Sequence, residues 1–152
     1  MFVDFATAFD RIPHSHLFYK LIKSGIHGKI LNILRSMYGK LKTCLRTPEG
    51  LTEFFVCLLG TRQGCMLSPF LFALYIEELI EMLKSAGCRG IYIDEFAENV
   101  MALLFADDVA ICSETVGRLR EMIKVLEDFS NKWGLKVNLT KPKLWFSEEV
   151  EK

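Results

Sequence analysis

The segment VMALLFADDVAIC, residues 100–112, carries two adjacent aspartates, Asp107 and Asp108, between two apolar runs. Short apolar runs of this kind are typical of buried strands. Two neighbouring carboxylates in such a setting repel one another and lose hydration unless a cation offsets their charge. The nearest basic residue downstream is Arg118, so the segment itself offers no cationic partner. It therefore predicts a divalent-cation site, and a cation held by carboxylates commonly handles phosphates.

A plainer interpretation of the same segment is a hairpin whose turn happens to contain two aspartates. Aspartate is a good turn former, so the turn and the metal site are equally favoured by these residues alone. Both interpretations predict that residues 100–106 and 109–112 pair as antiparallel strands.

The composition predicts a globular α+β protein. The chain has 152 residues, of which 51% are hydrophobic, and this is enough for one domain around a single core. Helical and strand patterns mix without a strict βαβ rhythm, which predicts an antiparallel sheet with helices packed on one face. One long helix is predicted from Ser68 to Gly87, and another follows Thr115 and ends at Gly134. Short strands are predicted at residues 90–93, 135–139 and 143–146.

Charge and cysteine content narrow the class of protein. The formal net charge is zero, which counts mildly against a nucleic-acid-binding protein, but residues 28–46 and 132–143 are basic and contain no acid. Each tract either follows a phosphate backbone or is an ordinary solvated surface. Five cysteines without CxxC spacing argue against a disulfide framework and favour an intracellular compartment, the cytoplasm or the nucleus. No segment has the pattern of a signal peptide or a membrane span.

The three histidines are close together near the start of the chain. His14 and His16 are two positions apart and would not share a helix face, and His27 follows later. All three are predicted to be surface or capping residues.

A second acid lies in a comparable setting. Asp4 belongs to the short apolar run of residues 2–5, which predicts a strand. If this strand lies beside the hairpin, Asp4 faces Asp107, and two metal ions about 3.5–4 Å apart can support an in-line displacement at phosphorus. The prediction is thus a phosphoryl-transfer centre built from distant parts of the chain.

Four segments in this order resemble reverse transcriptases: FVDFATAFD (2–10), GTRQGCMLSPFLF (60–72), FADD (105–108) and GLKVNLTK (134–141). The resemblance is strongest to the enzymes of non-LTR, or long interspersed element-type, retrotransposons, with group II intron maturases as relatives. It covers nearly the whole chain and implies a polymerase palm. Residues 1–152 would be the palm core, with the fingers and thumb largely missing.

The resemblance also implies roles for individual residues. Asp4, Asp107 and Asp108 would bind metal together with the main-chain carbonyl of Phe5, and Lys141 would be a general acid near the pyrophosphate. Phe9 would lie under the sugar of the incoming nucleotide and leave no room for a 2′-hydroxyl. The residues implied to contact the nucleotide are Phe5, Ala8, Phe9, Arg62, Gln63 and Gly64.

Each of these roles has a plainer alternative. Phe9 alone would be read as ordinary core packing, Arg62 as a solvated side chain, and Lys141 as one lysine in a basic tract. Gln63 and Gly64 alone would be read as a loop that leads into a helix, although Gln-Gly followed by Ser-Pro at this spacing is hard to explain as a turn only. A glycine also lets the backbone approach a ligand closely.

The implied activity is RNA-directed DNA synthesis. Two Mg²⁺ ions, with Mn²⁺ as a substitute, would support nucleotidyl transfer from deoxynucleoside triphosphates onto a primer 3′-hydroxyl. The partners would be an RNA template and a DNA primer. The alternatives are a catalytically inactive remnant of a mobile element and another palm-type polymerase that copies RNA into RNA.

Overall fold

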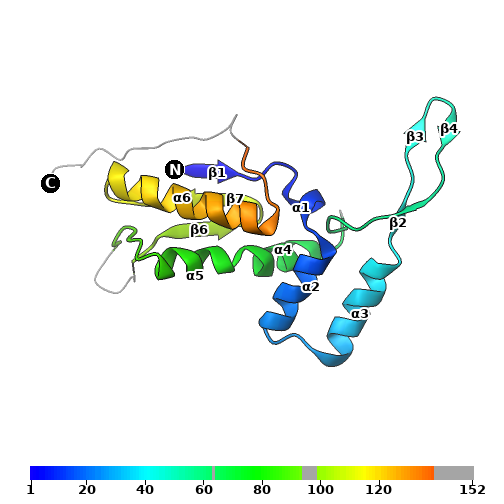
Figure 1. Ribbon diagram of the computed structural model, residues 1–152, viewed down its shortest axis with the longest axis horizontal. Coiled ribbons are helices and arrows are strands. Elements are labelled where there is room, and N and C mark those ends of the chain that lie inside the picture. Colours follow the sequence, from blue (N-terminus) through cyan, green and yellow to red (C-terminus); the bar gives the residue numbers. More distant parts are fainter. Residues whose placement is uncertain (63, 94–98, 139–152) are drawn as a thin grey trace. The chain divides into compact units, whose positions relative to one another are not determined.

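The computed structural model describes residues 1–62, 64–93 and 99–138. These residues form helices and antiparallel strands, which confirms the predicted α+β class (Figure 1). The chain divides into two compact units. The first unit comprises Met1–Ala8 and Ile76–Lys152, and the second unit comprises Phe9–Tyr75.

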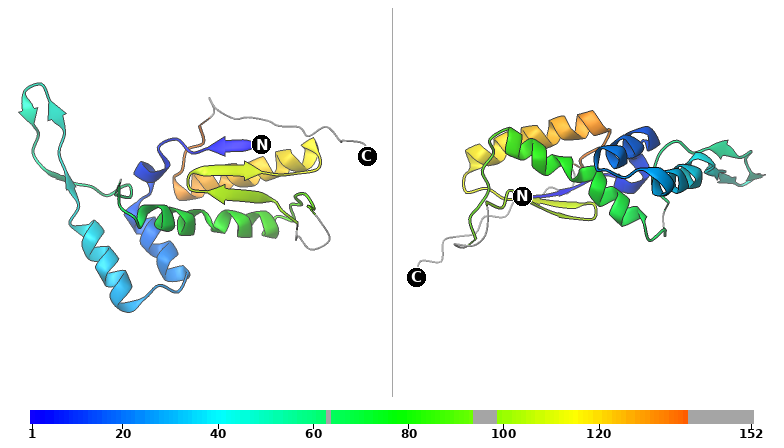
Figure 2. Two further views of the ribbon diagram at one scale, coloured as in Figure 1. Left: turned by 180° about the vertical axis from the view of Figure 1, so that it is seen from behind. Right: turned by 90° about the horizontal axis from the view of Figure 1, so that it is seen from below.

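In the residues that the structure describes, the first unit is a three-stranded antiparallel sheet with two helices. The strand order is β1-β7-β6, so the N-terminal strand lies against the second arm of the hairpin. Helices α5 and α6 lie together on one side of this sheet (Figure 2, right). The elements are β1 (Phe2–Asp4), α5 (Glu78–Ser85), β6 (Ala102–Phe105), β7 (Asp108–Ile111) and α6 (Val116–Trp133).

The two faces of the sheet differ because side chains alternate along each strand. Val3, Val109 and Ile111 point to the helices and are 3%, 0% and 0% exposed. The opposite face is open, and Phe105 there is 81% exposed. The apolar runs around the aspartates are strands as predicted, but the prediction that they are buried holds for one face of the hairpin and is wrong for the other.

The hairpin turn lies one residue earlier than predicted. Phe105 pairs with Asp108, so Ala106 and Asp107 form the turn and Asp108 is the first residue of β7. Asp108 is a strand residue because it pairs with Phe105 of β6 on one side and with Asp4 of β1 on the other. Ala106 has φ 51°, a backbone conformation that residues with a Cβ rarely adopt.

Helix α6 follows local sequence signals. The Thr115 hydroxyl accepts a hydrogen bond from the backbone N–H of Arg118, and Gly134 ends the helix with φ 73°. The buried face of the helix consists mainly of large apolar side chains: Leu119, Met122, Leu126, Phe129 and Trp133. Beyond Gly134, the predicted strand 135–139 appears only as a bridge between Val137 and Phe5, and its end lies outside the described residues.

Several other sequence predictions fall in the first unit or just before it. The long helix predicted from Ser68 to Gly87 is two helices, because the first ends at Ile76 and α5 begins at Glu78. The strand predicted at 90–93 is a single bridge between Ile91 and Val100. The strand predicted at 143–146 lies outside the described residues.

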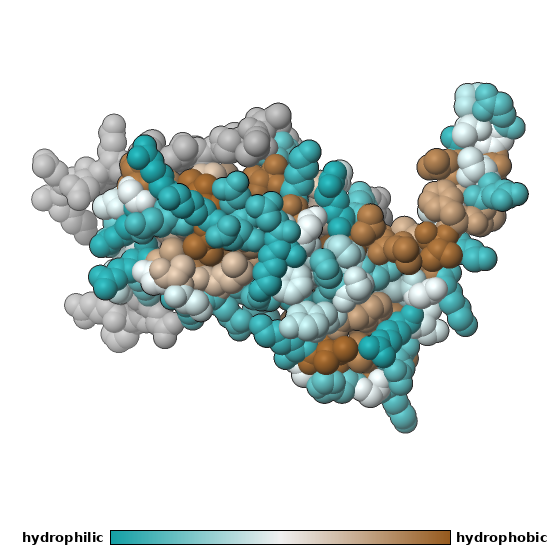
Figure 3. Space-filling model, viewed as in Figure 1, coloured by the Kyte–Doolittle hydropathy of each residue, from teal (hydrophilic) through white to brown (hydrophobic). Residues whose placement is uncertain are grey.

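The described residues of the second unit form four helices and one β-hairpin, whose two arms pair in two short stretches. Its elements are α1 (Ala8–Arg11, whose first residue belongs to the first unit), α2 (His14–Lys23), α3 (Gly28–Gly39), β2 (Lys42–Thr43) paired with β5 (Phe55–Val56), β3 (Arg46–Thr47) paired with β4 (Gly50–Leu51), and α4 (Ser68–Ile76). The hairpin exposes apolar side chains, which appear brown in Figure 3. The exposed set is Leu45, Leu51, Phe54, Phe55, Val56 and Leu58.

Two general features concern the chain as a whole. All five cysteines are free thiols. Within the described ranges, no helix is both long enough and apolar enough to cross a membrane.

The backbone at Ala106 makes a testable prediction about the hairpin. Ala106→Val should lower the free energy of unfolding by about 1–2 kcal/mol, because a β-branched side chain strains a backbone with positive φ. Ala106→Gly should have little effect or raise stability slightly. Thermal unfolding by circular dichroism measures both variants.

Ala110→Val is the matched control, because Ala110 lies in β7, where a β-branched residue is favourable. Equal destabilisation by Ala106→Val and Ala110→Val would contradict the turn geometry.

Candidate active site

Two acidic side chains from distant parts of the chain lie opposite one another on the open face of the sheet. Asp4 of β1 pairs with Asp108 of β7. Directly opposite residues of antiparallel strands have Cβ atoms roughly 4.5–5.5 Å apart and share one face of the sheet. Asp108 is exposed and Asp4 is half-buried, so both carboxylates can be reached from solvent.

Asp107 lies next to this pair in the turn. The sequence predicted that β1 lies beside the hairpin, and the structure confirms it. The residue directly opposite Asp4 is Asp108, where Asp107 was expected, because the turn occupies positions 106 and 107. Asp107 is thus a turn residue, as the plainer interpretation predicts, and Asp108 faces a second acid across the strand pair.

Asn138 holds Asp4 from the other side of β1. Its side-chain Nδ2 donates to Asp4 Oδ2 at 3.0 Å, and its backbone N–H donates to the Asp4 carbonyl at 2.8 Å. The backbone N–H of Ala6 completes this edge by donating to the Lys136 carbonyl at 2.7 Å. Sequence reasoning did not single out Asn138, although it lies in the segment GLKVNLTK, and only the pairing with β1 gives it a role.

Positive φ angles occur on both sides of the acidic pair. Among non-glycine residues of the described chain, Thr7 (φ 49°) and Ala106 (φ 51°) have this conformation. Thr7 follows Asp4 by three positions, and Ala106 directly precedes Asp107. Such backbone outliers concentrate at functional sites, which supports a functional reading of this face.

In the described residues, the protein supplies few side-chain ligands for a metal ion. In the parts of the chain that the structure describes, no group of three or more His, Cys, Asp or Glu side chains is arranged to hold a metal ion. Asp4 and Asp108 therefore present two opposed carboxylates on an accessible surface, with Asp107 adjacent in the turn.

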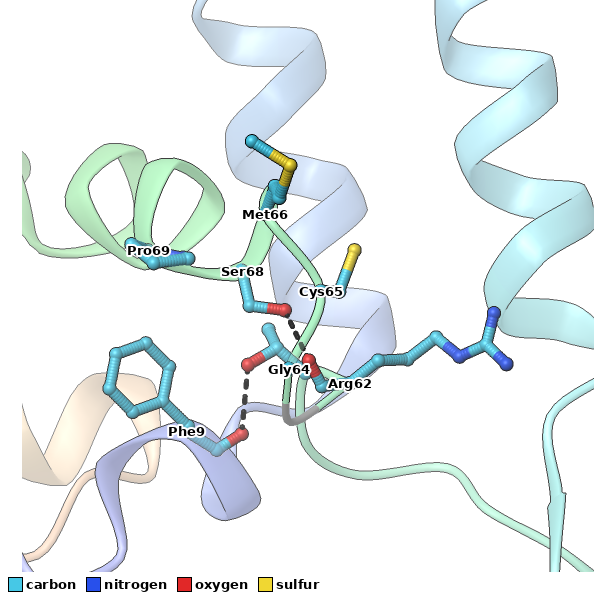
Figure 4. Close-up of a pocket in the computed structure, with 8 residues that line it drawn as sticks. Phe9, Arg62, Gly64, Cys65, Met66, Ser68 and Pro69 are labelled. Atoms are coloured by element: carbon cyan, nitrogen blue, oxygen red, sulfur yellow. Dashed lines mark hydrogen bonds between the residues drawn. The ribbon is translucent and has the colours of Figure 1, made fainter.

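A pocket of about 380 Å³ lies in the second unit, at the start of α4 (Figure 4). This volume is in the range usual for small-molecule sites. Predicted site residues Phe9, Arg62 and Gly64 line it. The other lining residues are Thr61, Cys65, Met66, Ser68 and Pro69.

Hydrogen bonds attach the loop that forms this pocket to neighbouring elements. The Thr61 backbone N–H donates to the Phe9 carbonyl at 2.6 Å, and the Thr61 hydroxyl donates to the same oxygen at 3.3 Å. The Ser68 hydroxyl donates to the Arg62 carbonyl at 2.7 Å (Figure 4). The ring of Phe9 packs against that of Phe72, with centroids 5.0 Å apart. Phe9 is thus both a packing residue and a pocket wall.

The remaining predicted residues are placed as follows. The Arg62 side chain extends away from Phe9 and Pro69 in Figure 4, while Gly64 has φ +77°. The side chains of Phe5 and Ala8 are each 2% exposed. Gln63 and Lys141 lie outside the described residues. The structure therefore groups Asp4, Asp107 and Asp108 in the first unit, and Phe9, Arg62 and Gly64 in the second.

The prediction for the histidines was wrong at His14. This residue is 8% exposed, and its Nε2 lies 2.8 Å from the Gly60 carbonyl. Nearby, burial raises the pKa of the Tyr38 hydroxyl, which lies beside the Ser68 side chain and the Arg62 backbone. His27 does occupy the capping position of α3, although its side chain makes no capping hydrogen bond. The burial of His14 depends on long-range packing and had no local sequence signal.

The family described as reverse transcriptase (RNA-dependent DNA polymerase) matches residues 1–151. The chain belongs to this family. The predicted palm-type α+β architecture and the assignment to RNA-directed DNA polymerases are thereby confirmed at the level of the family.

Curated relatives of this reverse transcriptase chain come from non-LTR retrotransposons. The chain is 29% identical over 140 residues to the "Retrovirus-related Pol polyprotein from type-1 retrotransposable element R2" of Popillia japonica, with 91% of the chain and 19% of the relative covered. It is 30% identical over 139 residues to the R2DM polyprotein of Drosophila melanogaster, covering 91% and 13%. It is 24% identical over 147 residues to the "RNA-directed DNA polymerase from mobile element jockey" of Drosophila funebris, covering 92% and 15%. The chain thus spans less than a fifth of the length of these relatives.

The opposed carboxylates predict an effect on stability. In metal-free buffer, Asp108→Asn should raise the free energy of unfolding by about 0.2–1 kcal/mol, because like charges directly opposite one another destabilise a strand pair. Added salt should shrink this gain, since exposed charges are screened. Thermal unfolding in the presence of a chelator measures it.

Asp128→Asn is the control, because Asp128 is an exposed acid on α6 away from the sheet. A lower melting temperature for Asp108→Asn than for the wild type would count against the proximity of Asp4 and Asp108.

Proposed function

We propose that this chain carries the nucleotidyl-transfer centre of an RNA-directed DNA polymerase from a retrotransposon-like element. The reaction would join a deoxynucleoside triphosphate to a primer 3′-hydroxyl and release pyrophosphate. The observation that carries the proposal is the cross-strand pairing of Asp4 with Asp108 on an open sheet face, with Asp107 in the adjoining turn. Family membership supplies the reaction class.

The carboxylates suit a divalent cation that arrives with its substrate. Mg²⁺ prefers oxygen ligands, keeps several waters, and is commonly held by one or two carboxylates together with substrate phosphates. Two opposed carboxylates match that demand without a complete cage of protein ligands. When bound, two such ions would lower the pKa of the primer hydroxyl and neutralise the developing charge on the triphosphate. In this proposal Asp4, Asp107, Asp108 and the Phe5 carbonyl hold the ions.

The neighbours of the carboxylates would keep them in place. The hydrogen bond from Asn138 holds one oxygen of Asp4 in place, as a supporting hydrogen bond does for a metal-binding carboxylate. The helix-covered face beneath is closely packed, so the strands that carry the acids are held by their core residues. Positioning of this kind lets the chain bind a substrate without rebuilding the site.

The pocket of the second unit would select the sugar. Phe9 forms one wall of a cavity of about 380 Å³, and its ring is held by Phe72. A fixed aromatic ring excludes a ribose 2′-hydroxyl by steric overlap. In this proposal Ala8, Arg62, Gln63 and Gly64 complete the nucleotide contacts and Lys141 protonates the leaving pyrophosphate, as the family resemblance implies. The template would be RNA and the primer DNA.

Two other functions remain as outcomes of experiment. An inactive remnant of a mobile element would bind neither metal nor nucleotide at these residues. A polymerase that makes RNA must admit the 2′-hydroxyl of its nucleotide. The ring of Phe9 at the pocket wall would block this group, which favours an enzyme that makes DNA.

Metal binding and primer extension test the proposed centre. Asp4→Asn and Asp108→Asn should each weaken Mn²⁺ binding, measured by electron paramagnetic resonance, by at least about tenfold, because a carboxylate ligand loses its charge. Both should reduce extension of a DNA primer on an RNA template by at least about a hundredfold.

Asp128→Asn, an exposed acid away from the sheet, should behave as the wild type in both assays. Metal binding that is unchanged in Asp4→Asn and Asp108→Asn would refute the proposed centre. A wild-type chain that neither binds Mn²⁺ nor extends a primer would favour the remnant.

Sugar selection gives a separate prediction. Phe9→Ala should raise the use of ribonucleotides relative to deoxynucleotides by at least about tenfold, because the ring no longer blocks the 2′-hydroxyl. Competition between the two nucleotides in primer extension measures the ratio. Phe54→Ala is the matched control, because Phe54 is a 66% exposed aromatic residue of the hairpin. An unchanged ratio in Phe9→Ala would show that Phe9 serves packing alone.

A further inference from the structure

We propose that His14 is a positioning residue for the pocket wall formed by Thr61 and Arg62, and that it acts through the backbone of Gly60. Its functional consequence rests on the function proposed above, since the pocket is the one assigned to the nucleotide sugar. The proposal itself concerns a contact within the second unit, between helix α2 and the pocket loop. His14 touches no substrate and would act through the backbone.

His14 is joined to the pocket loop by both its backbone and its ring. Its backbone N–H donates to the Leu58 carbonyl at 3.1 Å, and its ring Nε2 lies 2.8 Å from the Gly60 carbonyl. A carbonyl oxygen only accepts, so Nε2 carries the hydrogen and donates. Because the ring is 8% exposed, loss of this donor would leave a buried carbonyl unsatisfied.

Helix α3 fixes the orientation of the His14 ring. The Tyr38 ring meets it edge-on, with centroids 5.1 Å apart and planes at 74°. Tyr38 is 1% exposed and packs in turn against Phe18, with centroids 6.3 Å apart. The Tyr38 hydroxyl lies beside Ser68 and the Arg62 backbone, so one side chain adjoins both His14 and the far end of the pocket loop.

Gly60 is the point at which the loop has least freedom. It has φ +84°, and a Cβ built there would lie 3.0 Å from the Cα and the carbonyl oxygen of Asp10. Its backbone N–H donates to the Ile12 carbonyl at 2.8 Å. A side chain at position 60 would therefore press on α1, and the hydrogen bonds to Ile12 and His14 hold the Gly60 backbone in this place.

The position of Gly60 controls the pocket through the next residue. Thr61 donates both its backbone N–H and its hydroxyl to the Phe9 carbonyl. Displacement of Gly60 would move Thr61 and Arg62, while the Phe9 ring stays packed on Phe72. The wall and the ring would then separate, which should weaken nucleotide affinity and sugar selection more than it slows the chemical step.

A graded set of His14 variants tests the role. His14→Gln keeps an N–H donor at about the reach of Nε2, whereas His14→Asn places its amide short of the carbonyl and His14→Ala removes the donor. Hydrogen exchange of backbone amides in residues 59–62 should accelerate about tenfold or more in His14→Asn and His14→Ala, the effect expected for loss of one buried hydrogen bond. His14→Gln should stay within about threefold of the wild type. His27→Gln is the control, because His27 is exposed and makes no capping bond.

The outcomes separate this role from general stability and from the proposed function. Nitrogen NMR of the wild type should show hydrogen on Nε2 of His14, and hydrogen on Nδ1 alone would overturn the proposal. Slow exchange at residues 59–62 in His14→Asn would also overturn it. If His14→Ala does not fold, the comparison of His14→Gln with His14→Asn alone decides whether the proposed role holds.

The nucleotide assay then adds the functional arm. In primer extension, His14→Asn should raise the KM for a deoxynucleotide at least fivefold with kcat changed less than twofold, and His14→Gln should restore KM. A loss confined to kcat would overturn the positioning role. If the wild-type chain does not extend a primer, the proposed function is contradicted. The hydrogen-exchange measurement then tests the role of His14 by itself.

Discussion

Strand β1 pairs with β7 in a register that sets Val3 against Val109 and Asp4 against Asp108. The apolar pair faces the helices and the acidic pair faces solvent, so one register satisfies the core and creates the candidate site. A slip by one residue would turn Asp4 into the core and Val3 outward, which burial of a charge forbids. The hydrophobic core of the first unit therefore fixes the position of its carboxylates.

The second unit builds its pocket by a different means. The loop that begins at Gly60 is attached by hydrogen bonds to residues of α1 and α2. Phe9, held by Phe72, provides an apolar wall, and backbone groups provide the rest. The first unit thus carries its paired acids on a sheet, and the second unit forms its pocket from a hydrogen-bonded loop at the start of the segment GTRQGCMLSPFLF.

Local chemistry made parts of this structure predictable from sequence. Thr115 and Gly134 bound α6 because a cap and a left-handed glycine act within a few residues. The hairpin was predictable for the same reason, but its turn was placed one residue late, since Asp108 pairs both with Phe105 of β6 and with Asp4 of the distant strand β1. Burial of His14 and the contact of Asn138 with Asp4 arise from segments far apart in the chain, and periodicity contains no signal for either. The order of the four motifs identified the family. The residues around Asp107 and Asp108 alone favoured a turn and a metal site equally.

A double-mutant cycle on Mn²⁺ affinity tests the central claim most directly. Asp4→Asn, Asp108→Asn and the double variant are titrated with Mn²⁺ against the wild type. If the two carboxylates share an ion, the loss in the double variant falls well short of the sum of the single losses, since either substitution already disrupts the common site. Losses that simply add would mean that Asp4 and Asp108 bind metal independently, and the proposed shared centre would be wrong.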